Sequence, residues 1–261
     1  MTRRLHPATL DAALLSTRPL LLRIPFSHYC RKAEWGLTHA GIEYDTLDVA
    51  LWQMKHARRA NPKEGTVPVL KLDDRLVLGS GDILQWAEEN KAGAAAPLYP
   101  SPEVAEWERW ADEAIGPPAR REAYRALHAD PRLLKGYPEA PRYMAWPVAR
   151  RLYLNILRHY KARRFEATDP AALREALARV AARLAERGTG FLCASHPTAA
   201  DYATAALLEP LVAVAHARGL DDAPGWPAVA AFVARVRPTR LLRRRRRSLH
   251  WWHWRRFERL A

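Results

Sequence analysis

The sequence of 261 residues predicts a small α/β domain followed by an all-helical domain. Three observations lead to this prediction. Short apolar segments and one helix pattern alternate through the first ninety or so residues, separated by turn signals. A stretch rich in Ala, Gly and Pro follows at 91–102, which is typical of a linker. From Glu103 onward no segment has a convincing strand pattern, so the chain divides into two parts that are each long enough to form a core.

The first part begins with a strand, a helix and a second strand. Residues 19–25 are a short apolar run bounded by prolines, which predicts a buried strand of a parallel or mixed sheet. Residues 26–41 start with a polar residue and end on a glycine, as a helix with its start and stop signals does. Residues 42–49 alternate well enough for a strand, so the unit is βαβ.

A hairpin and a helix complete this part. Residues 66–72 and 75–78 are strand-like segments on either side of Asp73-Asp74, and residues 80–89 follow as a helix. We therefore predict one domain over 18–91, an all-helical domain over 103–238 and a separate tail over 239–261.

Two helix starts stand out in the second part. Asp169-Pro170 is an N-cap followed by proline at the first helical position. The spacing of the apolar residues after it places them on one helix face: Leu173, Leu177, Val180 and Leu184. Thr198 and Asp201 form a capping box that opens the apolar segment 202–217.

Charge and cysteine content narrow the class of protein. The net charge is +14, but residues 240–261 hold nine arginines and one glutamate, so the basicity belongs mainly to the tail. The only cysteines, Cys30 and Cys193, form no disulfide or metal-binding pattern. We find neither a secretory signal nor a membrane span, and we expect a cytoplasmic protein.

Three motifs carry a resemblance to a known family. They are Ser27-His-Tyr-Cys30 where a strand meets a helix, Thr66-Val-Pro-Val-Leu70, and Gly79-Ser-Gly-Asp-Ile83. In this order and spacing the chain resembles the glutathione transferases from about Leu20 to Val236. The resemblance implies a thioredoxin-like domain with a four-stranded mixed sheet (βαβ-ββα), a helical bundle domain, glutathione as co-substrate, no metal, and a homodimer.

The resemblance also implies where the chemistry lies. Amides at a helix N-terminus carry partial positive charge, so a glutathione thiolate beside Ser27 is stabilised there, and the hydroxyl can donate a hydrogen bond to it. This stabilisation lowers the thiol pKa and makes glutathione a nucleophile at neutral pH. We predict that Ser27 is the activating hydroxyl.

Two interpretations of Cys30 stay open at this point. The sequence Ser27-His-Tyr-Cys30 is also a thioredoxin-type Cys-x-x-Cys whose first cysteine is replaced. If Cys30 faces the helix terminus, it can form a mixed disulfide with glutathione, and the protein is a thiol transferase. If Cys30 faces the core, it is a small buried cysteine.

The remaining predicted glutathione contacts are Val67, Pro68, Gly79, Ser80 and Lys63. Val67-Pro68 resembles the cis-proline of the family, next to which the backbone pairs with the cysteinyl part of glutathione. Ser80 is expected to hold the γ-glutamyl carboxylate, and Lys63 the glycyl carboxylate. Gly79 departs from the acidic or amide residue usual in the family, and Asp82 is the nearest substitute. Trp107, Trp110 and Tyr124 are better explained as core than as a wall for the second substrate.

The sequence thus predicts a glutathione-dependent transferase acting on a small electrophile or disulfide. A second hypothesis comes from the tail, which interleaves arginines with three tryptophans. Such a segment can contact polyanions, so the alternative is a non-catalytic relative that engages nucleic acid or another macromolecule. A helix that packs its tryptophans inward is the simpler explanation of the tail.

Overall fold

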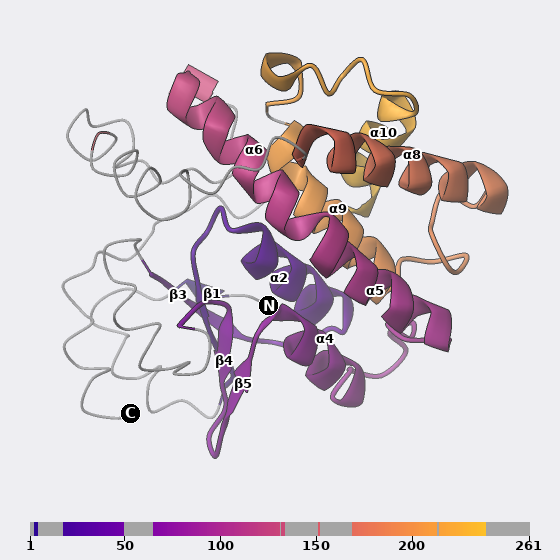
Figure 1. Cartoon of the computed structure of the whole chain (residues 1–261). Helices are drawn as coiled ribbons and strands as arrows, with labels where there is room; N and C mark the ends of the chain where they lie inside the picture. The colour runs from indigo at the N-terminus through magenta and orange to yellow at the C-terminus, as the bar shows by residue number, and fades with distance from the viewer. Residues whose placement is uncertain are drawn as a thin grey trace. The chain divides into compact units, whose positions relative to one another are not determined.

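The chain forms two compact units in a computed structural model, one up to Ala96 and the other over Pro97–Arg237 (Figure 1). The structure describes residues 3–4, 18–49, 65–130, 132–133, 151, 169–212 and 214–238. The 239–261 tail and Lys63 lie outside the described residues, as do the sequence segments between those ranges. We call the two parts the N-terminal unit and the C-terminal unit.

In its described residues the N-terminal unit is a mixed sheet with the helices α2 and α4, which confirms the predicted fold class. Its elements are β1 Arg3–Arg4, β2 Leu20–Arg23, α2 His28–His39, β3 Asp45–Asp48, β4 Val69–Lys71, β5 Leu76–Leu78 and α4 Ser80–Glu89. The sheet order is β1-β3-β2-β4-β5, with β3 parallel to β2 and to β1, and β4 antiparallel to β2 and β5. The sheet has a fifth strand, the edge strand β1, in addition to the four that were predicted. The sequence did not predict β1 because a strand of two residues is too short to show an alternating pattern.

The core of this unit forms around β2 and α2. All four residues of β2 are buried, as expected of a strand between two neighbours. Helices α2 and α4 pack closely at Gly36, where an added Cβ would lie 2.8 Å from the Leu84 side chain (Figure 1). Glycine therefore allows the two helices to approach each other.

The C-terminal unit is helical in the residues that are described. Its elements are α5 Pro102–Ala114, α6 Gly116–Ala129, α8 Asp169–Arg187, α9 Ala199–Val212, the short 3₁₀ helix η5 His216–Arg218, and α10 Trp226–Val236. Residues 199–211 of α9 are all buried, and α9 contacts α5, α6 and α10. A helix that is apolar all round belongs in the middle of a bundle. The apolar segment predicted to reach 217 leaves the α-helix at Val212, and its last part enters η5.

The start of α9 confirms the predicted capping box. The Asp201 carboxylate accepts hydrogen bonds from the Thr198 amide at 2.8 Å, the Thr198 hydroxyl at 2.7 Å and the Leu192 amide at 2.8 Å. Burial raises the pKa of Asp201, and the bonds from Leu192 and Thr198 oppose that rise. The carboxylate thus closes the helix N-terminus and ties the loop before it to the bundle.

None of the helices in the described ranges is long and apolar enough to cross a membrane.

Candidate active site

Three segments of the N-terminal unit meet at one edge of the sheet. In the antiparallel pair β2–β4, Leu22 lies opposite Val69, so the residues after β2 and those before β4 leave the sheet at the same edge. In the next pair Val69 lies opposite Leu78, which brings the end of β5 to that edge as well. The register therefore brings together the predicted site residues Ser27, Val67-Pro68 and Gly79-Ser80, although they come from three separate motifs.

Ser27 occupies the N-cap position of α2. A turn leads from β2 into the helix, in which the Ser27 amide donates to the Ile24 carbonyl at 2.9 Å. The Ser27 carbonyl accepts the Arg31 amide at 2.9 Å as the first bond of the helix, and the Ser27 side chain makes no capping bond. The hydroxyl is thus at the amino end of the helix without closing it.

The first turn of α2 differs from the first turns of the other helices. Of the α-helices whose bounds are described, α2 alone has neither an acidic residue nor a proline there. The amides of a first turn lack helical acceptors and carry partial positive charge. With no carboxylate of its own to offset that charge, the start of α2 favours an external anion.

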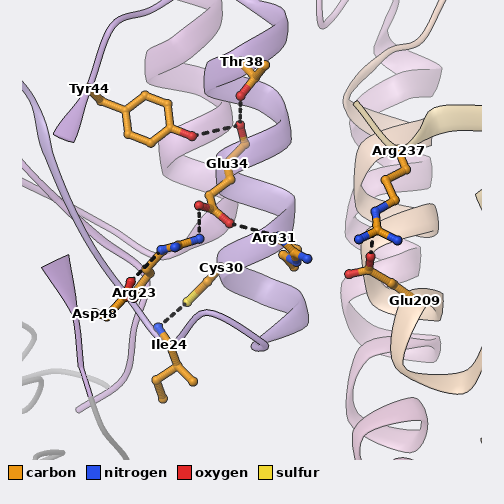
Figure 2. Close-up of polar contacts among 10 residues, drawn as sticks. All are labelled: Arg23, Ile24, Cys30, Arg31, Glu34, Thr38, Tyr44, Asp48, Glu209 and Arg237. Carbon is orange, nitrogen blue, oxygen red and sulfur yellow. Dashed lines mark hydrogen bonds and ion pairs between the residues drawn. The ribbon is translucent and has the colours of Figure 1, made fainter. Parts of the chain in front are cut away.

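Cys30 lies on the same turn but faces the core. Its side chain is fully buried, and the Ile24 amide donates to its sulfur at 3.4 Å (Figure 2). Burial raises the pKa of the Cys30 thiol to about 12, although hydrogen bonds from the Ile24 amide and the Ser27 hydroxyl act in the opposite direction. A thiol that stays protonated is a poor nucleophile, so the geometry favours the core interpretation of Cys30.

A buried ion cluster supports this corner and was not anticipated from the sequence. Figure 2 shows the Arg23 guanidinium between the carboxylates of Glu34 and Asp48. Its Nε lies 2.9 Å from Asp48 Oδ1, and its Nη1 pairs with Glu34 Oε1. Arg31 Nη1 lies 3.7 Å from the other Glu34 oxygen. The cluster joins β2, α2 and β3, and its Arg23 directly precedes Ile24, where the turn to Ser27 begins.

Glu34 is the centre of this cluster. Its side chain is 1% exposed, and its carbonyl accepts the Thr38 hydroxyl at 2.7 Å and the Tyr44 hydroxyl at 3.4 Å. The sequence contained one signal, the i,i+3 spacing of Arg31 and Glu34, which is common on exposed helix faces as well. Only the packing of α2 against β2 and β3 shows that these charges are buried.

The Val67–Pro68 peptide bond is cis, as the resemblance implied. Val67 and Pro68 are buried just before β4, and the Pro68 carbonyl accepts the Gly79 amide at 3.1 Å. This bond joins the second motif to the third, next to the start of α4.

Gly79 and Ser80 form the start of α4. Gly79 has φ 87° and ψ 159°, a region that is essentially restricted to glycine. Any residue with a side chain would be strained there. Ser80 is buried at the first helical position, and Asp82 is exposed on the same turn.

The tryptophans considered for a substrate wall pack within the C-terminal unit. The rings of Trp107 and Trp110 meet edge to face, with centroids 5.0 Å apart. The Arg179 guanidinium of α8 lies 4.2 Å from the Trp110 ring centroid and 4.9 Å from that of Trp107. These contacts join α5 to α8 and fit the core interpretation. Across the described ranges, no group of three or more histidine, cysteine or acidic side chains is placed to hold a metal ion.

Comparison with known protein families gives a consistent result for both units. Residues 21–95 match the family "Glutathione S-transferase, N-terminal domain", and residues 166–235 match "Glutathione S-transferase, C-terminal domain". Together the two matches cover more than half of the chain. The comparison with curated protein sequences found no significant match.

Solved structures of low sequence identity share the fold. The β-etherase LigF from Sphingobium sp. is 17% identical, with a TM-score of 0.63 over 85% of this chain and 95% of its own. The Tau class glutathione S-transferase from mango, Mangifera indica, is 17% identical, with a TM-score of 0.58 over 84% and 88%. A glutathione S-transferase from Xylella fastidiosa is 19% identical, with a TM-score of 0.56 over 84% and 92%. At these identities the similarity concerns the fold.

Proposed function

Because the chain belongs to the glutathione transferase superfamily, we propose that it activates the glutathione thiolate at the start of α2 and transfers it to a small electrophile. The observation that carries this proposal is the placement of Ser27. Its hydroxyl lies at a helix N-terminus that has no acidic residue of its own, at the sheet edge where the other two motifs converge.

In the proposed reaction the bound thiol loses its proton to water, and the sulfur is stabilised by the Ser27 hydroxyl and the α2 amides. The thiolate attacks an electrophilic carbon, a carbon–sulfur bond forms, and the leaving group departs with its electron pair. The backbone at Val67 and Pro68 pairs with the cysteinyl part of glutathione. Ser80 holds the γ-glutamyl carboxylate at the start of α4, and Lys63 the glycyl carboxylate.

Between the two reactions that the family supports, the environment of Cys30 favours conjugation. Thiol–disulfide exchange through Cys30 requires a reachable thiolate. The sulfur is fully buried and its pKa is raised, which works against that requirement. Ser27 is partly exposed at the same helix start and is the better candidate for contact with glutathione.

Two assays test this function. The first measures retention of the protein on immobilised glutathione, and the second measures conjugation of glutathione to an activated aryl chloride. Replacing Ser27→Ala removes one hydrogen bond to a charged sulfur, and we expect kcat/KM to fall roughly tenfold to hundredfold. Ser101→Ala, at the N-cap of α5, is the matched control and should retain full activity. A wild-type protein that neither binds nor conjugates glutathione would refute the proposal.

A second candidate function is a non-catalytic binding protein that uses its tail. Gly79 favours this alternative, because it provides no side chain for the γ-glutamyl ammonium. The tail itself lies outside the described residues. Full-length protein and a variant with glutamine at 243–247 would be compared for binding to a polyanion at low salt; equal binding would exclude a role of these arginines.

Two further proposals concern the oligomeric state of the protein and its cellular compartment. We propose a homodimer, which light scattering of the purified protein would detect by its mass. A reducing compartment such as the cytoplasm suits two buried cysteines that form no disulfide.

A further inference from the structure

Two contacts fasten helix α2 to the end of strand β2, and Ser27 lies between them in the chain. The Arg23 guanidinium pairs with the Glu34 carboxylate, as Figure 2 shows. The Ile24 amide donates to the Cys30 sulfur at 3.4 Å. The two donors are neighbours in the chain, whereas Cys30 and Glu34 are one helical turn apart on the same face of α2. The helix is therefore held at two successive points of that face.

The strand end to which α2 is fastened is itself held by β3. Arg23 lies opposite Asp48 in the parallel pair, and its Nε is 2.9 Å from Asp48 Oδ1. The Arg23 carbonyl accepts the Val49 amide at 2.7 Å. The guanidinium thus bonds Asp48 and Glu34 through two different nitrogens, which the single ammonium of a lysine could not do. Glu34 is consequently tied to a fixed point of the sheet.

The placement of α2 decides which atoms its first-turn amides can reach. The favourable charge at a helix N-terminus falls off within the first turn, and a hydrogen bond needs a donor–acceptor distance of about 3 Å and a nearly linear angle. The turn before the helix has one internal bond of its own, from the Ser27 amide to the Ile24 carbonyl at 2.9 Å. A small rotation or slide of α2 would therefore weaken its hold on an anion even though the helix stays intact.

We propose that Glu34 is a positioning residue, which through Arg23 holds the first turn of α2 and the Ser27 hydroxyl in the direction of the glutathione sulfur. This inference rests on the proposed function. The negative charge of Glu34 opposes a thiolate through space, so Glu34 helps the reaction only by placing the helix. Its removal would leave Arg23 and Arg31 without the carboxylate that they share, and both guanidiniums would attract a thiolate. The positional effect and the charge effect thus have opposite signs.

Replacement of the carboxylate separates these two effects. Glu34→Met has a similar length but no oxygen for Arg23, whereas Glu34→Gln keeps one carbonyl oxygen as an acceptor. If Glu34 positions α2, methionine raises the pKa of bound glutathione, and kcat/KM falls roughly tenfold at pH values below that pKa. The loss should vanish above it, where the thiol is ionised in either protein. Glutamine should restore kcat/KM to within about threefold of the wild type.

A buried carboxylate of the C-terminal unit provides the matched control for lost stability. The Glu122 side chain is 1% exposed, and its carboxylate lies 2.6 Å from Arg218 Nη2 and 3.0 Å from Arg125 Nη1. Glu122→Met should therefore destabilise the fold, as Glu34→Met does, but leave the pKa of bound glutathione unchanged. S-methylglutathione has no thiol to ionise, so Glu34→Met should bind it as the wild type does.

These measurements distinguish the inference from the proposed function. A wild-type pH profile in Glu34→Met, a lowered thiol pKa, or the same change in Glu122→Met overturns the role of Glu34 and leaves the transferase assignment intact. If Glu34→Met does not fold, Arg23→Lys makes the same test, because it keeps the charge but cannot bond both carboxylates. A wild-type profile in that variant also overturns the role. A wild-type protein that neither binds nor conjugates glutathione overturns both.

Discussion

Helices α2 and α9 begin in opposite ways. At α9 the Asp201 carboxylate takes three hydrogen bonds from Thr198 and Leu192, all within the buried bundle. At α2 the N-cap residue Ser27 makes no side-chain capping bond, and the first turn holds no acidic residue. A helix end closed by its own carboxylate stabilises the fold, whereas a helix end without one can bind an anion from outside. The start of α9 therefore serves the fold, whereas anion binding at the start of α2 is the proposal that the following variants test.

The largest effect on stability should come from the buried ion cluster around Glu34. Glu34→Ala leaves the buried Arg23 and Arg31 near each other without their shared carboxylate, and we expect a loss of about 3–5 kcal/mol in the free energy of unfolding. Glu43→Ala, which breaks the exposed pair with Arg18, is the control and should stay close to wild type. Urea denaturation measures both. A loss no larger in Glu34→Ala than in the control would show that the cluster does not stabilise the fold.

The closed end of α9 should depend on its carboxylate. Asp201→Ala leaves two buried amides without an acceptor, and we expect a loss of about 3 kcal/mol in the free energy of unfolding. Asp222→Ala removes an exposed carboxylate and should have little effect. The same denaturation experiment tests the pair. If both variants unfold at the same urea concentration, Asp201 has no special part in the bundle.

A carboxylate introduced at the start of α2 should close this helix end, as Asp201 closes the start of α9. In Ser27→Asp the new carboxylate repels the glutathione thiolate, and we expect conjugation to fall by about a hundredfold. The same change should raise the free energy of unfolding by about 0.5–1 kcal/mol, because the carboxylate complements the helix dipole. Ser101→Asp on α5 is the control for stability and should leave the conjugation rate unchanged. Full activity in Ser27→Asp would contradict an anion site at α2.

A third helix start, that of α4, provides a smaller test. Gly79→Ala forces alanine into a backbone region that only glycine occupies freely, and we expect a loss of about 2 kcal/mol in stability. Gly93→Ala is the matched comparison, since φ there is 54° and the left-handed region costs an L-residue about 1 kcal/mol. Thermal unfolding ranks the two variants. An equal loss would show that the extended backbone at Gly79 adds no requirement of its own.

Several parts of the fold could be predicted because their signals are local. The order of strands and helices up to Glu89 follows from apolar runs and turn residues in the sequence. The capping box at Thr198 is also local, since donor and acceptor lie three residues apart. The sequence predicted that Ser27 lies between a strand and a helix, and the structure confirms this. The role of Ser27 in binding glutathione stays a prediction.

Other features of the candidate site could not be predicted. Cys30 had two open interpretations, and its contact with Ile24 depends on how the turn folds back on the helix. Arg23, Glu34 and Asp48 are charged residues, which usually lie on the surface, so the sequence did not predict that they form a buried cluster. Strand β1 is too short to be recognised in the sequence. The positive φ of Gly79 could not be predicted either, because glycine adopts many backbone conformations.

The sequence by itself determined the class of the two units, the order of their elements and the three motifs of the candidate site. These depend on neighbours along the chain, where periodicity, turn residues and caps act directly. Only the tertiary structure decided that Cys30 faces the core and that Arg23 is enclosed by carboxylates from α2 and β3. The reason is that burial and ion pairing join residues such as Arg23 and Asp48, which are 25 positions apart and meet only when β2 and β3 pair.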